Sequence, residues 1–111
     1  MPKIEHPYKL GRGLNDRGSP IAKARVFKKE KRDIGFLMMQ ARRPPLPAKF
    51  VLTRISPSAI PMDDDNLVGA WKAGRDAIAQ WAGVDDGAVR FITFETRQER
   101  GPWGIRIEWG D

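Results

Sequence analysis

The sequence has no cysteine and only one histidine, His6, among its 111 residues. The absence of cysteine excludes disulfides and thiolate metal sites. A single histidine cannot build an imidazole-based site, so a metal site in this chain must rest on carboxylates. Carboxylates favour a hard ion, Mg²⁺ or else Mn²⁺, over zinc. A chain without disulfides also fits a reducing compartment, and we expect a cytoplasmic protein.

Long apolar runs are missing too, since no stretch approaches the roughly 18 residues of a membrane span. We therefore expect no membrane partner. Residues 1–20 are polar and interrupted by glycine and proline, without hydrophobic periodicity. This pattern predicts a flexible basic N-terminal arm. Residues 21–111 are enough for a single small domain.

The positive charge is concentrated in the first half of the chain. Residues 1–54 hold 14 Lys and Arg against 4 Asp and Glu, whereas residues 55–111 hold 6 against 10. A basic region beside an acidic one is common in proteins that act on nucleic acids, because cationic side chains supply most of the non-specific affinity for phosphate. A soluble basic protein without a polyanionic ligand has the same balance, so both interpretations stay open.

Hydrophobic periodicity predicts a small domain of the α/β (α+β) class, in which helices pack on a mixed sheet. The predicted elements are, in order, a helix over 21–41, a strand over 49–55, a helix over 66–82, and strands over 89–96 and 103–109. The first strand is nearly continuously apolar, as a buried central strand is. A right-handed parallel crossover should connect it to the second strand. Residues 97–102 should join the last two strands as an antiparallel hairpin.

Lysine and arginine dominate the exposed side of the first predicted helix and continue past its end. The side chains that we expect to contact DNA phosphates are Lys28, Lys29, Arg32, Arg42, Arg43, Lys49 and Arg54. Contacts of this kind position a protein on nucleic acid without reading its sequence. The same pattern also fits a solvated helix face.

Carboxylates gather in the stretch from 61 to 87. Three consecutive aspartates, 63–65, precede the second predicted helix, and the pair Asp85 and Asp86 follows it. Clustered carboxylates repel one another and rarely coexist without a cation or solvent between them. Magnesium is typically bound by one or two carboxylates together with water and substrate phosphate oxygens. The aspartates before the helix equally suit an N-terminal cap without any metal.

The second predicted helix has an apolar and a polar side. Its apolar stripe consists of Leu67, Trp71, Gly74, Ile78 and Trp81. Asp65, Lys72 and Asp76 project from the opposite side. Lys72 would stabilise developing negative charge near a metal site, or it forms an ordinary surface pair with Asp76 one turn later.

Together these motifs resemble the RusA family of Holliday-junction resolvases. The segments that carry the resemblance are Asp63-Asp64-Asp65-Asn66, Lys72, Asp76-Ala77-Ile78 and Val84-Asp85-Asp86. The similarity covers about residues 48–109. The chain resembles more closely the short RusA-like proteins of phages and prophages, which share an LTRISP-like strand and the motifs DNL, RD and GVDDG.

The resemblance implies a homodimeric, Mg²⁺-dependent endonuclease that acts on branched DNA in recombination and repair, in a bacterial host cell. The family's essential aspartates correspond to Asp63, Asp65 and Asp86, which the resemblance implies as metal-binding and catalytic residues. Its essential lysine corresponds to Lys72, with about three residues added before it. The supporting residues are Asn66, Asp76 and Asp85. The family's opening strand is not recognisable here.

A helix over 66–82 would be about 25 Å long, which separates Asp65 from Asp86. The two carboxylates meet within one chain only if the helix is short or bent, for instance at Gly69 or Gly74. Otherwise Asp86 must come from the second subunit of a two-fold dimer, and we expect such a dimer. Two alternatives remain: a family member that binds nucleic acid without cleaving it, and a small phage protein that binds another protein.

Overall fold

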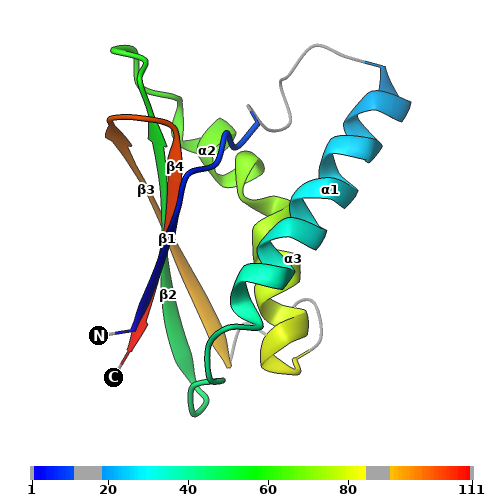
Figure 1. The fold of residues 1–111 in the computed structure, drawn as a ribbon, viewed down its shortest axis with the longest axis vertical. Coiled ribbons are helices and arrows are strands. Elements are labelled where there is room, and N and C mark those ends of the chain that lie inside the picture. The colour runs from blue at the N-terminus through cyan, green and yellow to red at the C-terminus, as the bar shows by residue number, and fades with distance from the viewer. Residues whose placement is uncertain (1, 12–18, 85–90, 111) are drawn as a thin grey trace.

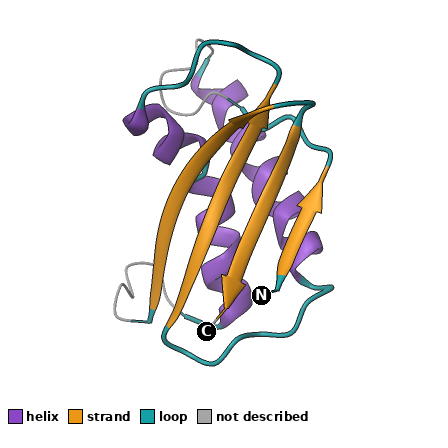
Figure 2. Cartoon of the chain, turned by 90° about the vertical axis from the view of Figure 1, so that its left-hand side faces the viewer, coloured by secondary structure: helices purple, strands orange, loops and turns teal. Residues whose placement is uncertain are grey.

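The computed structural model describes residues 2–11, 19–84 and 91–110. A four-stranded mixed sheet carries all three of the described helices on one face, and its other face is open (Figure 1, Figure 2). The elements are β1 (Lys3–His6), α1 (Pro20–Met38), β2 (Ala48–Ser56), α2 (Asp64–Ala70), α3 (Lys72–Ala82), β3 (Ile92–Arg100) and β4 (Gly104–Gly110). The predicted α+β class is confirmed.

Strand β2 lies inside the sheet, as its apolar sequence predicts. It pairs parallel with β3 and antiparallel with β4, so that Leu52 lies opposite Thr96 on one side and Ile107 on the other. The side chains of Phe50 and Leu52 are buried beneath the helices. The predicted parallel connection between β2 and β3 is therefore confirmed.

The predicted hairpin between the last two strands is wrong. The strand order is β1-β4-β2-β3, so β2 lies between β3 and β4. Strand β3 continues to Arg100, which takes up most of the expected loop. The short connection then passes over the end of β2, where the Gly101 N–H donates to the Ser56 carbonyl over 2.9 Å. Alternation shows which side of a strand is buried, but it does not show which strands are neighbours.

The predicted N-terminal arm also needs correction. Residues Lys3–His6 form β1, an edge strand that pairs antiparallel with β4. Leu10 is buried in the core, and the Gly11 N–H donates to the Glu30 carboxylate of α1 over 2.8 Å. A four-residue edge strand held mainly by backbone hydrogen bonds is too short to show an alternating pattern.

The Tyr8 hydroxyl donates to the Asp33 carboxylate over 2.8 Å and fixes the same N-terminal segment to α1. Burial, together with this carboxylate, raises the pKa of Tyr8. Burial also raises the pKa of Glu30, against the opposing effect of the Gly11 hydrogen bond. Residues 2–11 are thus part of the folded domain.

The acidic stretch contains two helices where the sequence predicts one. They meet at Trp71, whose backbone leaves helical geometry (φ −93°, ψ 4°) and whose N–H is shared between the carbonyls of Leu67 and Val68. The indole of Trp71 is fully buried. Gly74 leaves room for it, because an added Cβ would lie 2.8 Å from Trp71 Cε3 and 3.0 Å from Ile34 Cδ1. The chain thus bends at Trp71, between the two glycines where we considered a bend.

The predicted first helix is present, but it ends at Met38, three residues before the predicted residue 41. Ser19 precedes α1 and its hydroxyl accepts from the Ala22 N–H over 3.0 Å, while Pro20 occupies the first turn. Gly83 ends α3 in the left-handed conformation, with φ 78°.

Burying each large apolar side chain of the core contributes about 1.5–3 kcal/mol to the free energy of unfolding. The buried rings of Phe50 and Trp109 pack with the partly buried rings of Phe94 and Trp81, and neighbouring centroids lie 5.8–6.2 Å apart.

Candidate functional site

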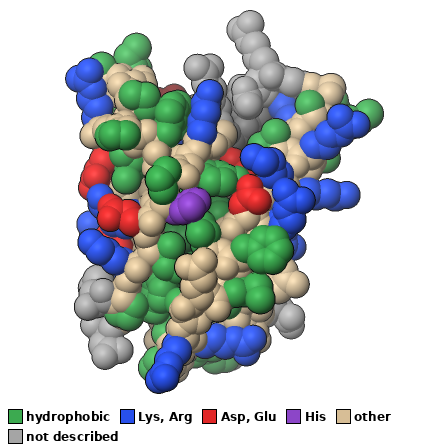
Figure 3. All heavy atoms as spheres, viewed as in Figure 1, with side chains coloured by type: hydrophobic (Ala, Val, Ile, Leu, Met, Phe, Trp, Pro, Cys, Tyr) green, Lys and Arg blue, Asp and Glu red, His purple; other side chains and the backbone are tan. Residues whose placement is uncertain are grey.

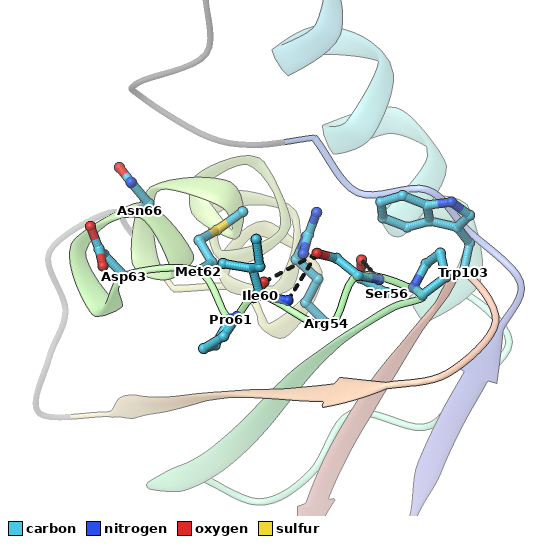
Figure 4. Close-up of a pocket in the computed structure, with 10 residues that line it drawn as sticks. Arg54, Ser56, Ile60, Pro61, Met62, Asp63, Asn66 and Trp103 are labelled. Carbon is cyan, nitrogen blue, oxygen red and sulfur yellow. Dashed lines mark hydrogen bonds between the residues drawn. The ribbon is translucent and has the colours of Figure 1, made fainter.

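A pocket of about 810 Å³ lies where β2 ends and the chain turns toward α2 (Figure 4). We call it the strand-end pocket. It is lined by Arg54 and Ser56 of β2, by the loop that follows, by Asp63 and Asn66 around the start of α2, and by Trp103. Three of the predicted site residues thus line one pocket.

The loop on one side of the strand-end pocket is fixed to β3. The Met62 N–H donates to Gln98 Oε1, and Gln98 Nε2 donates to the Met62 carbonyl, each over 2.8 Å. Ser58 Oγ further accepts from the Ile60 N–H over 3.2 Å. Gln98 positions the backbone directly before Asp63. The sequence carries no signal for this role, because a single glutamine in a polar strand segment is unremarkable.

Asp63 occupies the residue before α2, and its side chain makes no capping hydrogen bond. It is exposed, as are Asp64 and Asp65 in the first turn of the helix. Aspartates in a first turn stabilise a helix through its dipole by about 0.3–1 kcal/mol each, so part of this acidity serves the fold. The Asp63 carboxylate, however, has no hydrogen-bond or ion-pair partner among the described residues.

Figure 4 shows how these side chains lie. Asp63 and Asn66 project together at one end of the strand-end pocket, and Met62 separates them from Arg54. Asp65 does not line the pocket. The structure therefore brings Asp63 together with Asn66, and it leaves Asp65 exposed on the adjacent turn of α2.

Arg54 points from the helix-covered face of the sheet into the strand-end pocket. It is only 7% exposed. Its Cζ lies 5.2 Å from the centroid of the Trp103 ring, and Lys9 Nζ lies 5.3 Å from the same centroid. Cations over an indole are stabilised by about 0.5–2 kcal/mol. Arg54 is accordingly a buried cation that an anionic group reaches only by entering the pocket, unlike the exposed lysines of α1.

Lys72 lies apart from this pocket. It is exposed at the start of α3 and does not line the pocket with Asp63. Asp76 is half-buried, and within the described part of the chain it forms no ion pair with Lys72. The surface pair that the spacing allows is therefore not formed.

The second acidic pair, Asp85 and Asp86, lies outside the described residues. Phe91, the next described residue, is at the beginning of β2, where its carbonyl accepts from the Ala48 N–H over 2.8 Å. Gln98, which bonds to the residue before Asp63, is seven residues further along extended chain, about 23 Å away. Phe91 and Asp63 thus lie at opposite ends of the sheet.

The cations predicted to contact DNA divide between two faces of the molecule. Lysine and arginine gather over α1 on the face drawn in Figure 3. Lys29 and Arg32 lie 3.9 and 3.6 Å from the Asp33 carboxylate. Lys49 instead projects from the open face of the sheet and forms a 3.3 Å ion pair with Glu95. The seven predicted residues therefore do not form one continuous surface.

Charged pairs cover the open face of the sheet. Arg106 of β4 binds Glu5 of β1 through Nε over 2.7 Å, and it binds both carboxylate oxygens of Glu99 on β3 over 2.7 and 3.1 Å. These hydrogen bonds lower the pKa of Glu99 and raise that of Arg106. Arg97 and Lys49 likewise hold the pKa of Glu95 below its usual value. Glu5, Glu95 and Glu99 on this face are therefore all engaged by arginine or lysine, unlike Asp63.

No group of three metal-ligating side chains is found in residues 2–11, 19–84 and 91–110. In the same residues, no helix has the length and apolar character to cross a membrane. Comparison with protein-family models and with curated proteins finds no match to this chain.

Proposed function

We propose that the chain is a metal-dependent endonuclease of branched DNA, with its reaction site at the strand-end pocket. The observation that carries this proposal is the Asp63 carboxylate, which has no partner among the described residues and shares the pocket with Arg54. A carboxylate without a partner, at one end of a pocket that also contains a buried arginine and serine hydroxyls, suits a phosphodiester that must be bound and polarised. The motif resemblance to RusA-type resolvases supports the same reaction.

We propose that Asp63 and Asp65 supply the donors for Mg²⁺. Asp63 and Asp65 offer exposed carboxylate oxygens, which magnesium prefers together with water and phosphate oxygens. When bound, the ion would supply an activated water and neutralise charge on the phosphodiester. Asp63 and Asp65 would hold it, and the Asn66 amide would hydrogen-bond a neighbouring water or phosphate oxygen. Arg54 would attract the phosphate into the pocket by charge.

The proposed enzyme is a two-fold dimer in which Asp86 completes the partner's site. In the sequence, Asp86 is two residues after Val84, and Val84 follows the end of α3. Helix α3 ends near the end of the sheet at which β2 begins (Figure 1). Asp63 lies beyond the opposite end of β2. An antiparallel two-fold arrangement would bring the end of one subunit to the pocket of the other. Two such sites, related by symmetry, suit a junction whose strands are cut in pairs.

The decisive experiment is cleavage of a labelled four-way junction in Mg²⁺ by wild type, Asp65→Asn and Asp64→Asn. Asp64 is the matched control, because it is an equally exposed aspartate of the same helical turn. We expect Asp65→Asn to bind the junction normally and to cut it on the order of 100-fold more slowly or worse, since even groups one shell removed from a metal typically matter 10–100-fold. Asp64→Asn should cut normally. Equal activity of all three proteins would overturn the proposal.

A second candidate is nucleic-acid binding without cleavage. The position of Lys72 favours it, because this side chain is exposed on α3 and does not line the strand-end pocket. In that case wild type would bind the junction, with an affinity that falls steeply with salt, and would leave every branched substrate intact in Mg²⁺ or Mn²⁺. The cleavage assay above therefore separates the two candidates.

A further inference from the structure

A second concave surface lies between the exposed sides of α1 and α3. This surface, the helix groove, has a volume of about 500 Å³. Part of its lining is apolar: Phe36 of α1 and Met39, directly after α1, line it together with Ala77 and Trp81 of α3. Phe36 is 61% exposed and Met39 is 72% exposed. Two large apolar side chains are thus exposed to solvent in one concave surface, where a ligand could cover them.

The rim of the helix groove is cationic. Lys28, Lys31, Arg32 and Arg43 line it, and no carboxylate is found among its described lining residues. Arg32 lies 3.6 Å from Asp33, whereas Lys28, Lys31 and Arg43 have no ion-pair partner in the part of the chain that the structure describes. The groove therefore offers uncompensated positive charge around an aromatic floor.

The backbone of α1 is open at the centre of the helix groove. Gly35 lines it, and a Cβ added there would meet no atom within 4 Å. A flat group can thus approach the helix closely beside the ring of Phe36. Glycine in a helix interior costs about 0.5–1 kcal/mol relative to alanine, and at this position no packing of the folded chain requires it.

We propose that the helix groove binds unpaired nucleotides of single-stranded nucleic acid. A base would stack on Phe36, and the flanking phosphates would lie against Lys28, Lys31 and Arg43. Aromatic platforms within cationic grooves bind single strands in this way, because every base has a stacking face and every phosphate is anionic. This inference rests on the proposed function, since strands that open beside a branch point supply such nucleotides.

The cationic rim argues against a second copy of this chain as the occupant. Two helix grooves facing each other would bring eight lysine and arginine side chains together, and like charges across an interface cost several kcal/mol. An acidic protein segment would satisfy the charges, but it would not need a flat aromatic platform beside an open helix backbone. Charge and shape together favour a nucleotide.

The test is a titration of fluorescent twelve-nucleotide strands in EDTA, with an oligothymidine and an abasic strand of equal length as probes. The proteins are wild type, Phe36→Ala and Phe36→Trp, with Ile21→Ala as the matched control. Ile21 is an apolar residue of α1, 68% exposed, that does not line the helix groove. Both positions are exposed, so neither truncation removes core packing.

We expect Phe36→Ala to weaken oligothymidine binding by about 5- to 150-fold, the range of one lost base stack. Phe36→Trp should preserve the affinity, and Ile21→Ala should not change it. The abasic strand should bind wild type and Phe36→Ala equally, because it presents phosphates only. An unchanged oligothymidine affinity in Phe36→Ala, or an equal loss on the abasic strand, would overturn the inference.

A protein occupant is tested in the same format with a labelled polyglutamate peptide. If Phe36→Ala weakens peptide binding and leaves oligothymidine binding unchanged, the helix groove is a protein-docking surface and the inference fails. The titration contains no divalent ion and no branched substrate. Its failure therefore leaves the junction-cleavage test intact, and a failure of cleavage leaves this titration intact.

Discussion

The strand-end pocket and the helix groove differ in the sign of the charge that lacks a partner. In the pocket, the uncommitted group is the carboxylate of Asp63, and the cation Arg54 is buried against Trp103. In the groove, the uncommitted groups are cations around an exposed ring. A carboxylate that can hold a metal suits bond cleavage, whereas cations around an aromatic floor suit binding alone. The chain thus separates a proposed reaction site from a proposed binding site.

The largest expected effect concerns whether the pocket is completed by a second subunit. Asp65→Asn and Asp86→Asn should each be inactive on a four-way junction. Mixed in equal amounts and allowed to exchange subunits, they should recover about a quarter of the wild-type cleavage, because half of the dimers then contain one intact shared site. If each site is built within one chain, the mixture stays inactive. The control is a mixture of Asp65→Asn with itself, carried through the same exchange.

Gly35 of α1 and Gly74 of α3 differ in how tightly their surroundings are packed. Gly74→Ala should lower the free energy of unfolding by about 1–3 kcal/mol, as overpacking does, because its Cβ would lie 2.8 Å from the rigid Trp71 ring. Gly35→Ala meets nothing within 4 Å and should be neutral or raise stability by up to about 1 kcal/mol. Urea denaturation of both variants measures the difference. Equal destabilisation by both substitutions would show that atoms pack against Gly35, contrary to the open space around it.

Salt dependence distinguishes the cations of the helix groove from those of the open sheet face. Lys28→Ala should lower the slope of log affinity against log salt for single-stranded DNA by about 0.7, the value for one lost phosphate contact. Lys49→Ala should leave the slope unchanged, because Lys49 projects from the other face and is paired with Glu95 at 3.3 Å. If Lys49→Ala lowered the slope more than Lys28→Ala, the DNA would contact the open face of the sheet and not the helix groove.

The smallest expected effect concerns Arg106, which binds glutamates of β1 and β3. Arg106→Gln should lower the unfolding free energy at pH 7 by at most about 1 kcal/mol, since the pairs are partly exposed. Its hydrogen bonds lower the pKa of Glu99, whose ordinary value is 4.5. The stabilisation is therefore fully present above pH 4.5 and is lost as the pH falls through the lower folded-state pKa.

Urea titrations of wild type and Arg106→Gln at pH 7 and pH 3 measure this loss, and the difference in unfolding free energy between the two proteins should be smaller at the lower pH. Arg100→Gln is the matched control, because Arg100 is exposed on β3 and has no ion-pair partner among the described residues. A constant difference between wild type and Arg106→Gln at both pH values would contradict the assignment to Glu99.

The sequence predicts the helices and their buried sides well, because residues three and four apart report directly on one face. Leu67, Trp71 and Ile78 of the predicted apolar stripe are buried, as their spacing predicts. The order of strands is not encoded locally: nothing in β3 or β4 shows that β2 lies between them. β1 is too short for a pattern, and its pairing is made by backbone groups.

The candidate site is only partly predictable for the same reason. Asp63 and Asn66 stand out because they are local to a helix start. Gln98 and Trp103 do not, because they reach the strand-end pocket through the strand order and the connection over β2. Phe36 does not lie on the buried side of α1, so hydrophobic periodicity gives it no role. Its 61% exposure beside Trp81 in the structure is what identifies the helix groove.

The most direct test of the separation between cutting and binding is a junction assay on Asp63→Asn that records binding in EDTA and cleavage in Mg²⁺ from the same preparation. The proposed site predicts wild-type affinity with cleavage reduced on the order of 100-fold or more, because Asp63 is the carboxylate that shares the strand-end pocket with Arg54. Cleavage by Asp63→Asn at the wild-type rate would contradict it.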